Sequence, residues 1–171
     1  MEKKPTSYAE WEAAVPAEIR GDSVWQVRAY RFALFLADLA WHDAGRLMSD
    51  KRSLGIVDQL VRAVGSISAN IEEGYSKGTG RDRARFYEYA LGSARESRGW
   101  YYKGRHVLGE PIVSHRMQML TEVVKLLLTM VPDQRHSRLR EDTPDYQVGG
   151  VLISQTEIGA TSLSEEASIP W

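Results

Sequence analysis

Four segments of the sequence repeat apolar residues with the period of about 3.6 that an α-helix gives, and this repetition constrains the fold most. Short stretches rich in Gly, Ser or Pro separate the segments, and no stretch before residue 145 alternates convincingly as a strand would. We expect helices over residues 23–48, 54–75, 81–108 and 111–131. This order predicts an all-α protein built as a four-helix bundle.

The expected helix ends coincide with capping and helix-breaking residues. Ser23 suits the N-cap of the first helix, and the glycines of residues 76–80 suit the turn after the second. Pro111 suits the first turn of the fourth helix, where its missing N–H costs no hydrogen bond. Pro132 is expected to follow the end of that helix, near residue 131.

Charge divides the chain into three parts. Residues 1–22 carry three Lys/Arg and five Asp/Glu, residues 23–136 carry 17 and 12, and residues 137–171 carry two and six. We therefore expect an N-terminal arm, a basic four-helix bundle and a non-helical, acidic tail with these bounds. The basic middle points to phosphate-bearing partners, while the acidic ends either compete for the same surface or keep the protein soluble.

The tail lacks a helical period and is rich in Gly, Ser and Thr from Thr143 onward. Gly149 and Gly150 would suit a hairpin turn. Alternatively, the tail stays disordered until it binds, with residues 169–171 (Ile-Pro-Trp) as a short apolar anchor. We favour partial disorder.

Two features that the sequence lacks indicate the compartment in which the protein is expected. It contains no cysteine, which excludes disulfides, thiolate metal sites and cysteine nucleophiles and fits a reducing compartment. Its N-terminus has no apolar signal region, and its apolar runs are too short to cross a membrane. We therefore expect a cytoplasmic protein with no membrane partner.

The first and fourth predicted helices carry more apolar surface than a solitary bundle covers. The apolar residues of the fourth spread over about 200° of the helix, and the first is apolar around most of its circumference. Self-association is the economical explanation for this surplus. The alternative is that the arm, with Tyr8, Trp11 and Val15, or the C-terminal tail folds back over it.

The third predicted helix separates a core side from a basic side. The core side carries small and aromatic residues, namely Phe86, Ala90, Ser93, Ala94, Ser97, Tyr101 and Gly104. The outward side carries cations and a tyrosine: Arg81, Arg85, Arg95, Arg98, Tyr102 and Arg105, with Lys103 beside them and Lys77 before the helix. Spaced arginines can bridge successive phosphates, and a tyrosine can stack on an unpaired base. The outward side is therefore a candidate surface for RNA or single-stranded DNA, with a merely solvated helix face as the alternative.

The second predicted helix carries a polar stripe opposite its apolar side, made of Gln59, Arg62, Ser66, Asn70 and Glu73. Such residues either are simply exposed or form hydrogen bonds across a subunit boundary.

The residue patterns of known catalytic sites are missing. None of the four histidines (His42, His106, His115 and His136) follows a Glu by three residues, as a di-metal bundle requires. Asp38 and His42 could touch a metal but fit an ordinary helix-surface pair better. Residues 78–80 (Gly-Thr-Gly) lack the rest of a phosphate-binding loop. We predict no catalytic residues, no metal and no cofactor.

The second and third helices together carry a longer pattern. Residues 59–75 read QLVRAVGSISANIEEGY, and Phe86, Ala90, Gly92, Ser93 and Glu96 follow. This combination of Q-L-x-R-A-x-x-S-I-x-x-N-I-x-E-G with A-x-G-S-x-x-E resembles the bacterial four-helix bundle proteins encoded in intervening sequences of 23S ribosomal RNA genes. The resemblance covers about residues 23–131, starting near Trp25.

The resemblance implies a left-handed up-down bundle, a ring-like homopentamer with a basic surface, and no enzymatic activity. A related bundle is an accessory subunit of a reverse transcriptase in diversity-generating retroelements, where it binds the enzyme and nucleic acid. The family pattern falls on residues that we interpret as structural or as a subunit interface: Gln59, Arg62, Ser66, Asn70, Glu73, Gly74, Ser93 and Glu96.

Two functional hypotheses follow. The first is a non-enzymatic, homo-oligomeric, pentameric accessory protein that binds RNA or single-stranded DNA through its third helix. The alternative is an oligomeric scaffold that holds a partner enzyme, such as a reverse transcriptase, through residues 137–171.

Overall fold

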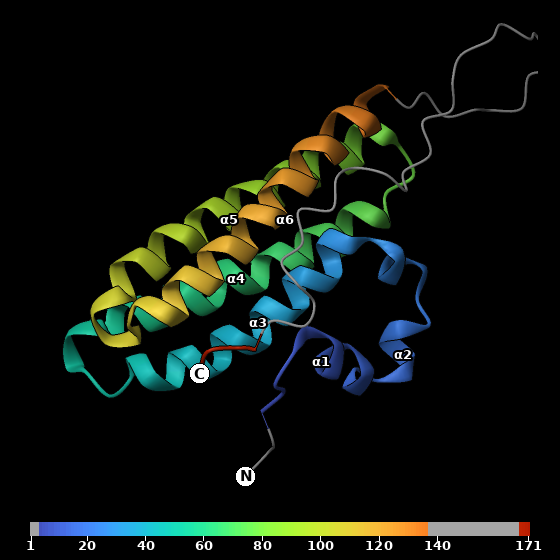
Figure 1. Ribbon diagram of the computed structural model, residues 1–171. Helices are drawn as coiled ribbons and strands as arrows, with labels where there is room; N and C mark the ends of the chain where they lie inside the picture. Colours follow the sequence, from blue (N-terminus) through green and yellow to red (C-terminus); the bar gives the residue numbers. More distant parts are fainter. Residues whose placement is uncertain (1–3, 137–167) are drawn as a thin grey trace, which may run out of the picture.

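The computed structural model describes residues 4–136 and 168–171. Four long helices dominate it: α3 (Arg28–Leu47), α4 (Leu54–Tyr75), α5 (Gly80–Leu108) and α6 (Glu110–His136). Consecutive helices pack side by side, and α6 also packs against α3 (Figure 1). The predicted all-α, up-down four-helix bundle is confirmed. The expected hairpin or disorder of the tail falls on residues 137–167, outside the described residues.

The start of the chain is more structured than an arm. It forms α1 (Tyr8–Ala14), α2 (Ala17–Arg20) and the 3-10 turn η1 (Ser23–Gln26). The first bundle helix was predicted from Ser23, but α3 begins at Arg28 because η1 and the extended Val27 come first. Ser23 is therefore not its N-cap: Asp22 caps η1 through its side chain, and no side chain caps α3.

The last bundle helix runs past the residue predicted to end it. Gly109 ends α5 with a positive φ of 84°, and α6 begins directly afterwards at Glu110. Pro132 lies inside α6, which continues to His136. Pro132 removes one N–H from the helix hydrogen bonds and its ring crowds the carbonyl one turn earlier, but an ion pair between Arg135 and Glu88 of α5 holds the turn that follows. The predicted end near residue 131 was wrong for this reason.

Helix α1 and Val15, which follows it, cover part of the apolar surplus of α3. Tyr8, Trp11 and Val15 are buried, and the ring of Trp11 lies 5.0 Å from that of Phe35 between centroids. The indole N–H of Trp11 donates a hydrogen bond of 2.5 Å to Asp38 on α3. For α3, the structure therefore agrees with the alternative that the arm folds back over the helix.

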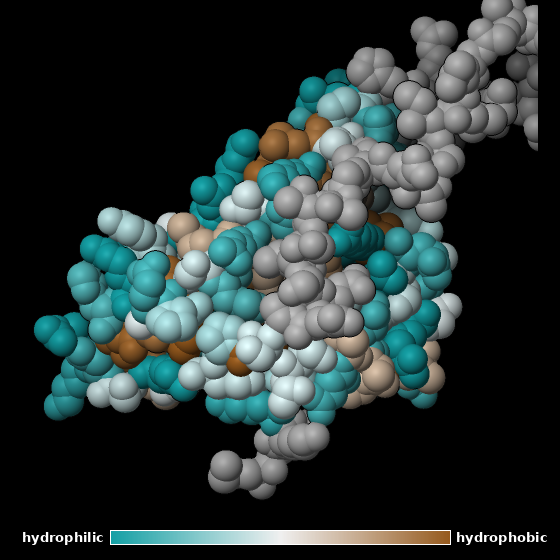
Figure 2. Space-filling model, in the orientation of Figure 1, coloured by the Kyte–Doolittle hydropathy of each residue, from teal (hydrophilic) through white to brown (hydrophobic). Residues whose placement is uncertain are grey.

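A few large apolar side chains stay on the surface of the described residues. Leu128 on α6 is 47% exposed, and Met48 and Leu54 beside the α3–α4 turn are more so. Figure 2 shows a mostly hydrophilic face with hydrophobic patches near both ends of the bundle. Within residues 4–136 and 168–171, no helix combines the length and the apolarity needed to cross a membrane.

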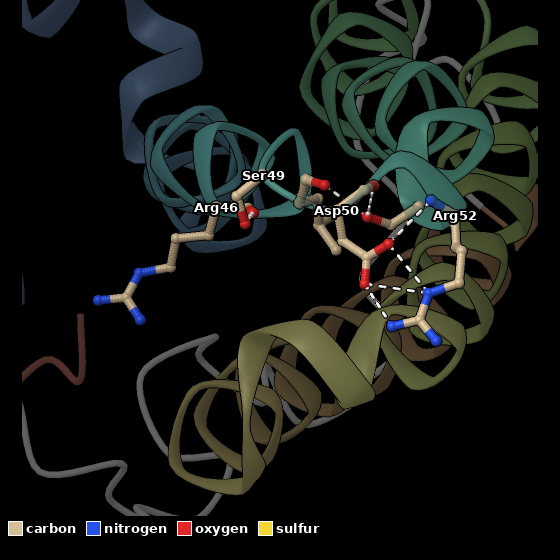
Figure 3. A network of polar contacts seen from close by, with 6 residues as sticks. Arg46, Ser49, Asp50 and Arg52 are labelled. Atoms are coloured by element: carbon tan, nitrogen blue, oxygen red, sulfur yellow. Dashed lines mark hydrogen bonds and ion pairs between the residues drawn. The ribbon is translucent and has the colours of Figure 1, made fainter.

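A compact polar network stabilises the turn in which the chain reverses direction between α3 and α4 (Figure 3). Asp50 accepts hydrogen bonds from the backbone N–H of Arg52 at 2.9 Å and from its guanidinium at 2.6 Å. These bonds lower the pKa of the Asp50 carboxyl to about 2. Ser53 donates from its hydroxyl to the carbonyls of Asp50 and Leu47. The turn therefore satisfies the backbone groups at the end of α3 locally.

Close packing between α4 and α5 depends on Gly74. A Cβ at this position would lie 2.8 Å from Cε1 of Tyr87 and 3.0 Å from Cβ of Phe86, closer than real contacts allow. Gly65 on the same helix has nothing within 4 Å of the equivalent position. Only the first of these two glycines is therefore required by packing.

We expect Gly74→Ala to lower the free energy of unfolding by about 1–3 kcal/mol, because the added methyl forces α4 and α5 apart. Gly65→Ala is the matched control and should raise it by about 0.5–1 kcal/mol, since alanine favours the helix. Urea unfolding followed by circular dichroism measures both. Equal stabilisation by the two substitutions would show that the helices do not pack this closely.

Candidate nucleic-acid interface

Helix α5 concentrates positive charge on the bundle. It contains seven Lys/Arg and three Asp/Glu. Of the residues predicted to face outward, Arg81, Arg85, Arg95, Tyr102 and Lys103 are exposed. Arg98, Arg105 and Lys77 are half-buried.

The structure does not place all eight predicted residues together. Four of them recur every three or four residues on one side of α5, and we call them the arginine stripe: Arg95, Arg98, Tyr102 and Arg105. Tyr102 and Arg105 also line a groove of about 670 Å³ with Val113 and Met117 of α6.

The remaining cations lie elsewhere around the stripe. Arg81 and Arg85 occupy the first turns of α5 on a neighbouring side, and Lys103 shares that side about 27 Å further along the helix. Lys77 precedes α5, forms an ion pair of 3.0 Å with Glu73 and lies over the ring of Phe86. Lys77 is therefore engaged between α4 and α5 and does not extend the stripe.

Cations on α5 pair with aromatic rings, two of which (Tyr89 and Trp100) were not predicted from the sequence. The Arg85 guanidinium donates to the Tyr89 hydroxyl at 2.7 Å, and the Lys103 ammonium lies 3.8 Å from the ring centroid of Trp100. Arg105 lies 4.0 Å from the ring centroid of Tyr102. The signal was present, because each ring stands three or four residues from its cation, the spacing of neighbours on a helix.

The carboxylates of α5 are already engaged. Asp82 accepts a hydrogen bond from the Thr79 hydroxyl, Glu88 pairs with Arg135, and Glu96 accepts one from the indole N–H of Trp100.

Three arginines of α5 keep their guanidinium donors available. Among residues 4–136 and 168–171, Arg81, Arg95 and Arg98 have no hydrogen bond or ion pair to another side chain. Planar guanidinium groups of this kind suit phosphate oxygens, which they bind with two parallel N–H bonds.

Three members of the polar stripe of α4 make their contacts within that helix, whereas Glu73 pairs with Lys77 beyond its end. Ser66 donates to the carbonyl of Arg62 at 2.8 Å, and Asn70 donates to the carbonyl of Ser66 at 2.7 Å. Arg62 pairs with Asp58 at 3.6 Å, and Gln59 is half-buried. Ser93 on α5 likewise bonds the carbonyl of Tyr89. A role for these residues at a subunit boundary stays a prediction.

Asp38 and His42 each contact a tryptophan side chain. Asp38 accepts from the Trp11 indole, and the His42 ring meets Trp171 edge-on at 5.1 Å. No group of three or more potential metal-binding side chains occurs in the described part of the chain.

A buried polar cluster was not anticipated from the sequence. Arg116 on α6 is fully buried, and its Nε donates to Oδ2 of Asp43 on α3 at 2.8 Å. The Tyr101 hydroxyl donates to the same oxygen at 3.0 Å, and burial raises the pKa of Tyr101. Burial also lowers the pKa of the adjacent His115 to about 4. A charged residue at a core position of an apolar helix was the available signal, four residues after Ile112 and four before Leu120.

A protein-family model and a solved structure both match the bundle. Residues 25–129 match a family model described as 23S rRNA-intervening sequence protein. The crystal structure of a protein of unknown function from the S23 ribosomal protein family of Bacteroides thetaiotaomicron VPI-5482 has a TM-score of 0.57 and 21% identity. The match covers 60% of this chain and 97% of that chain. No curated protein matches at a significant level.

Proposed function

Because the chain belongs to the 23S rRNA-intervening sequence protein family, we propose that it is a non-enzymatic, homo-oligomeric accessory protein that binds RNA or single-stranded DNA through α5. The observation that carries this proposal is the set of three unpaired arginines, Arg81, Arg95 and Arg98, on a helix whose carboxylates are all engaged. Arg95 to Arg105 span about 15 Å of helix, long enough to meet several phosphates of one strand. Exposed Tyr102 offers a ring near the same path.

The binding proposal is tested by reversing charge on the arginine stripe. We expect Arg95→Glu with Arg98→Glu to weaken binding of a fluorescein-labelled 20-nucleotide single-stranded RNA by about tenfold or more at low salt, because two phosphate contacts become repulsive. Fluorescence anisotropy measures the change.

The matched control reverses two exposed arginines away from α5, Arg20 on α2 and Arg46 on α3. It changes the net charge by the same amount and should weaken binding much less. Equal losses in the two variants, or no binding by the unaltered protein, would contradict a site on α5.

We also propose that the chain self-associates. The apolar surfaces of α3 and α6 support this proposal to different degrees. Helix α1 and Val15 already cover part of the apolar surplus of α3, whereas Trp41 on the same helix is 73% exposed. Exposed Leu128, Met48 and Leu54 remain as contacts that assembly would bury. The number of five copies rests on the family resemblance alone.

Light scattering combined with size exclusion tests the assembly. We expect a mass of about five times the chain mass of 19.3 kDa at micromolar concentration. A mass of one chain under these conditions would contradict the assembly and leave the nucleic-acid proposal standing on its own test.

The scaffold alternative loses one of its expected contacts. We predicted residues 169–171 as an apolar anchor for a partner, whereas the structure seats them on the chain's own bundle. A scaffold would therefore have to bind its partner through residues 137–167, or residues 169–171 would have to detach from the bundle first.

A further inference from the structure

Residues 168–171, which we call the terminal segment, lie against the bundle although 31 residues separate them from the end of α6. The segment follows α3 in Figure 1. Its Ile169 side chain is buried, and the Ile169 backbone N–H donates to the carbonyl of Thr6 at 3.1 Å. The Pro170 carbonyl accepts a hydrogen bond of 3.1 Å from Nη2 of Arg116. These are the contacts of a bound peptide: one buried apolar side chain and two main-chain hydrogen bonds.

Trp171 completes the set of contacts. Its ring meets His42 edge-on, with the Lys4 ammonium 4.9 Å and the Arg116 guanidinium 5.9 Å from its centroid. Cations near the face of a tryptophan are attracted to it, more strongly when partly desolvated. The ring also borders a hollow of about 610 Å³ that Trp11 and Trp41 help to line.

The receiving side is held in place by the bundle itself. Arg116 is fixed by Asp43 through both Nε and Nη2, at 2.8 and 3.2 Å. Asp43 in turn accepts from the Tyr101 hydroxyl. Only one of the guanidinium's hydrogen bonds goes to the terminal segment, so Arg116 keeps its geometry without that segment. A preorganised site of this kind binds its ligand at a lower entropic cost.

The connection to α6 is longer than docking on the same chain requires. Arg116 stands 20 residues before the end of α6, which corresponds to about 30 Å of helix. The 31 intervening residues can span up to about 100 Å when extended. A four-helix bundle is two helices across, or about 20 Å, so the same length is enough to reach the equivalent site of a neighbouring bundle.

We propose that Thr6, His42 and Arg116 mark a peptide-binding site whose ligand is the terminal segment, and that in the assembled protein this segment comes from a second copy of the chain. When two copies exchange their terminal segments, every contact within a chain is replaced by the same contact between chains. No contact is lost, and the copies become linked. The claim that the segment comes from a second copy rests on the proposed assembly. The claim of a peptide-binding site does not depend on it.

The site is tested with the full-length variant Ile169→Asp with Trp171→Ala, which leaves the receiving groups intact. A labelled peptide with the sequence of residues 165–171 (EEASIPW) should bind this variant saturably and bind the unaltered protein at least about tenfold more weakly, because its own segment competes. A control peptide with the same two replacements should not bind. Absence of binding by the natural peptide would overturn the site.

The exchange is tested by disulfide trapping, for which the absence of native cysteine gives a clean background. Full-length His42→Cys and Trp171→Cys, made as separate variants with different tags, are mixed and oxidised. We expect a covalent product containing both tags, and none when Gly92→Cys on the exposed face of α5 replaces His42→Cys.

The variant with both cysteines in one chain distinguishes the two sources of the segment. If it closes only within single chains while the mixture gives no joint product, exchange between copies is overturned. A joint product supports exchange whether or not the protein binds RNA.

Discussion

Replacing Arg116 by methionine is expected to lower the free energy of unfolding by about 3–5 kcal/mol, because it leaves Asp43 buried without a counter-charge. Both side chains are almost completely buried and meet at 2.8 Å. Their attraction largely offsets the cost of removing two charges from water, so losing one partner exposes the full cost of the other. Urea unfolding at neutral pH, followed by circular dichroism, measures the loss.

The double variant Asp43→Leu with Arg116→Met is the control for this prediction. It removes both charges and fills the space with apolar atoms, so we expect it to recover most of the lost stability. A single variant as stable as the unaltered protein would mean that Arg116 does not pair with Asp43 in the core.

Replacing Trp11 by alanine is expected to cost about 3–5 kcal/mol, the range for removing a large aromatic side chain from a core. Trp11 is buried among the rings of Tyr8, Trp25 and Phe35 and hydrogen-bonds Asp38. The prediction therefore tests whether the N-terminal helices belong to the same cooperative core as the bundle. Thermal or urea unfolding provides the measurement.

Trp41 offers a matched control on α3. Its side chain is 73% exposed, so Trp41→Ala should change the free energy of unfolding by no more than about 0.5 kcal/mol. If both replacements cost equally little, the N-terminal helices do not pack on α3 as described.

The sequence predicted the helices whose boundaries are set locally. Residues 54–75 form α4 as expected, and α5 starts one residue earlier than predicted, after Thr79 caps it through its hydroxyl. The short α1 and α2 escaped prediction because so few residues give no clear apolar period. The stability of α1 comes instead from the rings that it places against α3.

The candidate interface was predictable only where spacing within one helix determines it. Helical spacing places Arg95 and Arg98 on one side of α5 from sequence alone. It does not show that Arg135 of α6 neutralises Glu88, or that Lys77 turns toward Glu73 and Phe86. Such pairs depend on how helices meet, which the order of residues in one helix does not contain. The docking of Pro170 on Arg116 joins positions 54 residues apart and was unpredictable for the same reason.

Salt dependence of RNA binding tests the central proposal most directly. If α5 binds phosphates, the logarithm of the association constant falls linearly with the logarithm of salt concentration, with a slope of about −0.7 for each phosphate contacted. Contacts by Arg81, Arg95 and Arg98 predict a slope of about −2 for the unaltered protein. Arg95→Glu with Arg98→Glu should make the slope shallower by at least about 1.4. A slope near zero, or one that this double variant leaves unchanged, would contradict nucleic-acid binding by α5.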